Sequence, residues 1–152
     1  MLIICDSREK ANQRIIEYFD KHNIPYKIEK LDTGDYMDSE KMTITVDRKK
    51  DLIELTQNLC SSDQSRFWRE IRRSKTDGIK MIVLCEHGGK IHSIKDVAAW
   101  KNPYSKVSGR SLMNEIYRVH IAYGVEFLFC DKRSTGRRIV ELLGYDGRRD
   151  QS

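Results

Sequence analysis

A chain of 152 residues has room for one domain with a buried core, and its 39% hydrophobic and 34% charged residues are typical of a soluble globular protein. The longest apolar runs, about five residues, are too short for a membrane span or the core of a signal peptide, so both are excluded. The net charge of +5 and the pI of about 9.0 favour a polyanionic partner.

In chain order, the apolar patterns alternate between the period of a strand and that of a helix. The expected elements are strand 2–5, helix 10–22, strand 25–30, strand 42–48, helix 52–59, helix 64–77, strand 80–86, a short helical stretch at 93–100, helix 110–123, strand 125–130 and helix 135–144. Ser62 and Asp63 are the expected cap of helix 64–77. This alternation predicts an α/β fold with a mixed central sheet, in a single domain over 1–145 that is followed by a polar tail at 146–152.

The four cysteines, Cys5, Cys60, Cys85 and Cys130, have neither the pairing nor the spacing of zinc ligands. Three of them close apolar runs, which predicts reduced thiols in the core. They indicate a reducing cytoplasm, and a bacterial or phage-type context fits this composition.

The chemically informative residues lie around the strand 42–48. Asp35 follows Gly34 in a turn before this strand, and Asp47, Arg48 and Lys49 lie at its end. Because side chains alternate along a strand, Asp47 and Lys49 are expected on one face and Arg48 on the other. Two carboxylates beside an ammonium can hold a divalent cation and assist water in phosphodiester hydrolysis. The alternative is a turn-stabilising aspartate beside a surface ion pair.

Three ordered motifs resemble those of the XPF/Hef-type nucleases, which belong to the restriction-endonuclease-like class. The segments are Ile3–Glu9, similar to a first strand that ends in D-x-R-E; Leu31–Tyr36 with Val46–Lys49, similar to the GD…ERKxxxD signature; and Arg66–Glu70, similar to an arginine-led helix. Asp47 stands where the family has glutamate. Asp51 comes two positions before the last signature aspartate and would equally suit the first turn of a helix.

The resemblance implies a restriction-endonuclease-like central mixed sheet flanked by helices, and a metal-dependent DNA endonuclease that cuts branched, forked or flap DNA. Asp35 and Asp47 are the expected direct ligands of Mg²⁺ or Mn²⁺, since both ions prefer carboxylate and water oxygens. Asp6, at the end of the first strand, is expected to supply a third oxygen or to hold a water on the metal. Lys49 is expected to polarise the attacking water or to offset charge in the transition state.

Further residues join this site by resemblance. Glu9 is expected near the metal and Arg8 at a phosphate, although both would also suit the start of a helix. Arg48 joins the catalytic candidates as part of the signature. Arg66 is expected to reach the scissile region or to pair with Glu70 one helical turn away.

The same helix carries the predicted DNA-binding surface. Arg66, Arg69 and Arg73 recur at a spacing that places them on one face, while Phe67 and Ile71 point to the core. We expect this face to bind DNA phosphates.

The expected partners are DNA and a second copy of the chain, with no membrane. The helix 110–123 predicts a dimer surface in the C-terminal half through its apolar residues Leu112, Met113, Ile116, Val119 and Ile121. The family's usual DNA-binding regions are not expected here, so a separate DNA-targeting or helicase partner could select the substrate. The alternatives are a non-catalytic nucleic-acid-binding module of the same fold and a receiver-like phosphoacceptor domain.

Overall fold

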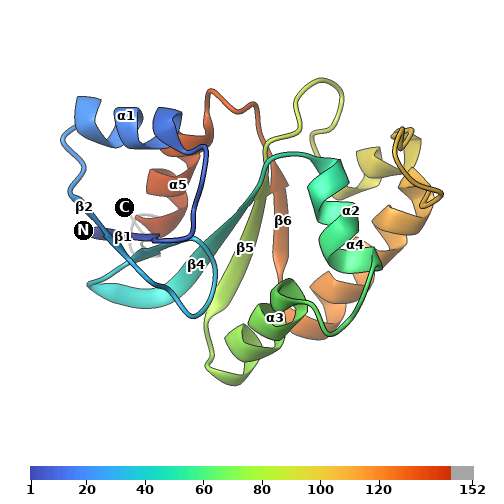
Figure 1. Cartoon of the computed structure of the whole chain (residues 1–152), viewed down its shortest axis with the longest axis horizontal. Helices are drawn as coiled ribbons and strands as arrows, with labels where there is room; N and C mark the ends of the chain where they lie inside the picture. Colours follow the sequence, from blue (N-terminus) through green and yellow to red (C-terminus); the bar gives the residue numbers. More distant parts are fainter. Residues whose placement is uncertain (145–152) are drawn as a thin grey trace, which may run out of the picture.

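The computed structural model describes residues 1–144, and a six-stranded mixed sheet forms its centre (Figure 1). The strands are β1 (Ile3–Asp6), β2 (Tyr26–Glu29), β3 (Tyr36–Asp38), β4 (Lys41–Lys49), β5 (Lys80–Cys85) and β6 (Glu126–Phe129). Their order across the sheet is β2-β1-β3-β4-β5-β6. β3 runs antiparallel to both of its neighbours, and the remaining pairs are parallel. The predicted α/β fold with a mixed sheet is confirmed, and the central antiparallel strand contradicts a receiver-like, doubly wound parallel sheet.

Helices cover both faces of this sheet (Figure 1). α1 (Gln13–Lys21) and α5 (Thr135–Leu143) lie on one face; α2 (Leu52–Cys60), α3 (Arg66–Thr76), α4 (Gly109–Tyr123) and the short 3₁₀ helix η1 (Ile94–Ala99) lie on the other. Within residues 1–144, no helix is both long and apolar enough to cross a membrane.

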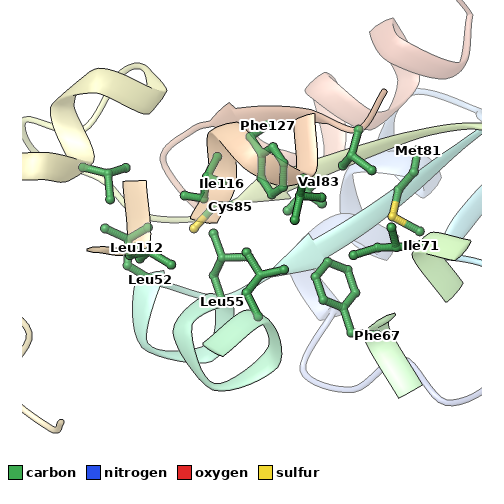
Figure 2. Packing of buried hydrophobic residues seen from close by; sticks show 14 of the residues in the cluster. Leu52, Leu55, Phe67, Ile71, Met81, Val83, Cys85, Leu112, Ile116 and Phe127 are labelled. Atoms are coloured by element: carbon green, nitrogen blue, oxygen red, sulfur yellow. The ribbon is translucent and has the colours of Figure 1, made fainter. Parts of the chain in front are cut away.

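Two large hydrophobic cores result, one on each side of the sheet, and a smaller cluster consists of Ile4, Leu31 and Met37. Along β5, Met81, Val83 and Cys85 point into the larger core under α2, α3 and α4 (Figure 2). Leu84 points the other way, into the core under α1 and α5, and Val46 of β4 joins it there. The alternation of β4 therefore directs Asp47 and Lys49 toward α2 and α3, and Arg48 toward α1 and α5.

Two helices begin more than one residue away from their predicted starts. Helix α1 begins at Gln13 and not near residue 10, because Ala11 has a left-handed backbone with φ of 52°. Helix α3 is capped by Ser65, whose hydroxyl accepts from Trp68 N, and not by Ser62 and Asp63. Capping depends on which side chain faces the first free N–H groups, which several neighbouring polar residues can satisfy.

Strand β3 was not predicted from the sequence. Its three residues are all buried, so they show no alternation of polar and apolar side chains. The predicted tail at 146–152 lies outside the described residues.

Candidate active site

A buried ion pair at the end of β4 lines a cleft. Lys49 Nζ lies 2.8 Å from Asp47 Oδ2, and both side chains are less than one-tenth exposed. The ammonium also sits 3.9 Å from the centroid of the Phe67 ring, a cation–π contact that fixes its position. The pair is therefore a buried one, not the surface pair of the alternative interpretation.

Asp35 joins this pair through the turn before β3. Gly34 has φ of +75°, and a Cβ there would lie 2.0 Å from Thr45 Oγ1, so the close approach of the turn to β4 requires glycine. Asp35 N donates to Val46 O at 2.9 Å, and Asp35 Oδ2 accepts from Arg48 N at 2.8 Å. The turn thus fixes Asp35 against the strand that carries Asp47.

The buried carboxylates repel one another. Burial, the Asp47 charge and the Glu9 charge together hold the pKa of Asp35 well above its usual range. Burial and Asp47 likewise raise the pKa of Glu70 to about 7. Burial alone would lower the pKa of Lys49, but the Asp47 carboxylate outweighs it, and that pKa is raised. At neutral pH the lysine is therefore a cation within a cluster that still favours additional positive charge.

These groups line an open cleft of about 490 Å³. It brings together most of the predicted site residues with several polar residues of α2 and α3. The lining residues are Arg8, Glu9, Asp35, Asp47, Arg48, Lys49, Glu54, Gln57, Asn58, Ser61, Ser65, Arg66, Phe67 and Glu70. Asp6 is not among them.

The Asp6 side chain binds the loop at Leu31. Its carboxylate accepts from Leu31 N at 2.8 Å and from Arg8 Nε at 3.0 Å, and the Arg8 guanidinium also donates to Leu31 O. These contacts explain the burial of Asp6 and orient Arg8 toward the cleft. The geometry thus gives Asp6 a positioning contact, and its expected role at the metal stays a prediction.

Arg48 and Glu9 form a network on the opposite face of β4. Arg48 donates to Glu9 through Nε at 2.9 Å and through Nη2 at 3.1 Å, and to Glu86 Oε1 through Nη1 at 2.8 Å. The Tyr36 hydroxyl donates to Glu9, and Thr135 Oγ1 donates to Glu86 Oε2 at 2.5 Å. Arg48 therefore links β4 to the segment before α1 and, through Glu86, to the start of α5. Both carboxylate oxygens of Glu9 accept hydrogen bonds from Arg48 in this network.

Several residues of the site were missed by the sequence reasoning. Glu86 closes the Arg48 network, and four polar side chains of α2 and the residue after it line the cleft: Glu54, Gln57, Asn58 and Ser61. Their i, i+3, i+4, i+7 spacing is that of one helical face, and it could have indicated them. Asp51, in contrast, is the N-cap of α2 and accepts from Glu54 N at 2.8 Å, as the helix-start interpretation expected.

Two carboxylates are available to a cation here. In the part of the chain that the structure describes, no three His, Cys, Asp or Glu side chains are grouped as a complete metal cage. Asp47 Oδ2 is nevertheless buried, and apart from its ion pair with Lys49 at 2.8 Å it has no hydrogen-bond partner among the described residues. Magnesium commonly binds through one or two carboxylates and keeps several waters. Asp35 and Asp47 fit that donor set.

The arginine face of α3 lies beside the cleft. Arg66, Arg69 and Arg73 are exposed while Phe67 and Ile71 are buried, which is the arrangement that the spacing predicts. Arg66 Nε lies 3.8 Å from Glu70 Oε2, a long ion pair.

Helix α4 offers less surface than expected. Leu112, Ile116 and Val119 are fully buried against the sheet, and Ile121 is 80% exposed. The apolar face that suggested a dimer surface is thus mostly used inside the domain.

The comparisons with known proteins identify a family and a shared fold. A family model for the ERCC4 domain matches residues 5–142. Among solved structures, XPF from Aeropyrum pernix shares the fold with a TM-score of 0.70 and 18% identity, over 94% of this chain and 63% of that one. XPF from Aeropyrum pernix in complex with DNA matches with a TM-score of 0.65 and 17% identity, over 97% and 68%. No curated protein matches significantly. The chain spans about 63% of the first of these structures.

Proposed function

The chain belongs to the ERCC4 domain family, and from that premise we propose that it is a metal-dependent endonuclease that hydrolyses phosphodiester bonds in branched, forked or flap DNA. The observation that carries the proposal is the buried Asp35–Asp47 pair with Lys49 in one open cleft. Buried like charges are costly unless a cation compensates them. The structure of XPF from Aeropyrum pernix with DNA supports DNA as the substrate.

Asp35 and Asp47 would hold Mg²⁺ or Mn²⁺. When bound, the cation supplies Lewis-acid stabilisation of the phosphate charge and eases deprotonation of water. Lys49 remains protonated because Asp47 raises its pKa, so it acts as a donor to the attacking water or to the phosphate oxygens and not as a base. Arg8 and Arg66 at the cleft wall would bind the phosphate that flanks the scissile bond. The family resemblance implies products with a 5′-phosphate and a 3′-hydroxyl.

The test is cleavage of labelled forked, flap, nicked and linear DNA with Mg²⁺, with Mn²⁺ or with EDTA. Asp35→Asn and Asp47→Asn should each abolish cutting while circular dichroism shows an intact fold. Asp51→Asn is the matched control, because asparagine caps a helix as well as aspartate and residue 51 does not line the cleft. Full activity of Asp47→Asn, or cutting in EDTA, would refute the proposal.

A non-catalytic nucleic-acid-binding module is the second candidate. It is favoured by the absence of a third metal-binding carboxylate among residues 1–144 and by the Lys49 ammonium, which already neutralises part of the Asp47 charge. Binding of forked DNA without cleavage in either metal would establish it.

Substrate choice is a further part of the proposal. A homodimer through the C-terminal half, or a separate DNA-targeting or helicase partner, would select the DNA structure. Light scattering with and without forked DNA tests the dimer, and a monomer in both conditions would remove it.

A further inference from the structure

A second hollow of about 200 Å³ adjoins the cleft. Five cationic side chains line it, from three parts of the chain: Arg8, Lys30, Arg66, Arg69 and Arg73. The hollow and the cleft share Arg8, Arg66 and Glu70, so the two spaces lie side by side.

The charge of this hollow is only partly balanced. Two acidic residues, Asp32 and Glu70, also line it. Arg69 Nη1 donates to Gln64 O at 2.7 Å and Arg73 donates to Asp32 O, and neither arginine forms an ion pair with the described residues. A guanidinium bound to a carbonyl keeps its full charge and has further N–H donors. The hollow therefore suits an anion with several acceptor oxygens.

The backbone contacts also hold these arginines in place. Arg73 bridges α3 to the loop at Asp32, and Arg69 bridges back to the residue before the α3 cap. Arg8 is oriented by Asp6 and by Leu31 O. Less side-chain entropy is then lost when an anion binds, which favours a defined site over a diffuse basic surface.

We propose that this hollow binds one phosphate of the DNA strand whose scissile phosphate lies in the cleft, and that it fixes the register of that strand. The inference rests on the proposed DNA-cleaving function and adds to it a distinct subsite in which Arg69 and Arg73 bind the phosphate, with Lys30 in the lining. Phosphate contacts position a nucleic acid without reading its sequence. The subsite therefore sets where the strand is cut relative to a junction, for every sequence alike.

Binding of a single phosphate in this hollow leads to a quantitative expectation for the salt dependence of DNA binding. Each neutralised phosphate contributes about 0.9 to the slope of log K against log[salt] on duplex DNA. If Arg69 and Arg73 bind the same phosphate, the variant Arg69→Ala/Arg73→Ala loses about 0.9 of slope, whereas two separate phosphates would give about 1.8.

The experiment measures binding of forked DNA in EDTA at several salt concentrations, so that it does not depend on cleavage. Arg133→Ala/Arg137→Ala is the matched control, with the same loss of charge at side chains that are 79% and 59% exposed near α5. We expect a slope reduced by about 0.9 in the Arg69/Arg73 variant and unchanged in the control. An unchanged slope, an equal fall in the control or a fall of about 1.8 would each overturn the single-phosphate site.

A second measurement locates the phosphate. Neutral methylphosphonates are placed one at a time along the strand, and one position should weaken binding by the wild type but not by the Arg69/Arg73 variant. Equal sensitivity of both proteins at every position would overturn the subsite. A wild type that shows the subsite but never cuts DNA would instead refute the nuclease proposal alone.

Discussion

Replacing Glu86 with glutamine should destabilise the domain by about 2 kcal/mol. The Glu86 and Arg48 side chains are only 7% and 10% exposed, and their charged atoms lie 2.8 Å apart. Removing one partner of a buried pair costs about 3–5 kcal/mol when the other is left alone, but here Arg48 keeps Glu9 at 2.9 Å. The loss is then nearer that of one charged hydrogen bond, about 1.5–3 kcal/mol. For a domain of this size, 2 kcal/mol lowers the Tm by roughly 4–8 °C.

Urea titration and thermal melting of Glu86→Gln measure this loss. Glu141→Gln is the control, because Glu141 is 49% exposed and pairs with Arg137 and Arg138 at the surface. Surface pairs contribute about 0–1 kcal/mol, so the control should melt close to the wild type. Equal stability of the two variants would refute the reasoning that the Arg48 network clamps β4.

Three further outcomes follow from the site. Lys49→Met should lower the cleavage rate by about 10²–10³ while calorimetry shows near-normal Mn²⁺ affinity; weak metal binding with a normal saturated rate would contradict the role of Lys49. Gly34→Ala should unfold more easily in urea and cut poorly, since the new Cβ would meet Thr45 Oγ1 at 2.0 Å in a left-handed turn, and wild-type stability would be inconsistent with that clash. Burial and Asp47 raise the pKa of Glu70 from 4.5 to about 7. The folded metal-free protein therefore retains a proton that the unfolded chain releases, and its stability falls as the pH rises from about 4.5 to about 7. Glu70→Gln in EDTA should flatten this fall, and an identical pH profile would disprove the assignment.

The parts of the site that follow from local geometry could be predicted from the sequence. Asp47 and Lys49 share a face of β4 because a strand alternates, whatever surrounds it. The exposed arginines of α3 follow in the same way from helical spacing. Both patterns require only the type of element, which the sequence indicated correctly.

The remaining parts depend on contacts between distant segments. Glu86 lies 38 residues from Arg48, and no local pattern connects them. The sequence indicated that Asp6 ends a strand, but no local pattern indicated that its carboxylate accepts from Leu31 N, 25 residues away. On α4, the helical spacing of the apolar residues correctly indicated an apolar face. This spacing does not distinguish a face that packs inside the domain from one that binds a second copy of the chain.

The two faces of β4 act together in this site. On one face, Asp47 lies with Asp35 in a cleft, where burial and the Asp47 charge raise the pKa of Asp35. On the other face, the Arg48 side chain binds Glu9 and Glu86, while its backbone N–H binds Asp35 directly. We therefore propose that Arg48 is a positioning residue: its contacts hold the strand and the turn together at the point where the carboxylates repel, so that a cation would bind to a pair that is already in place.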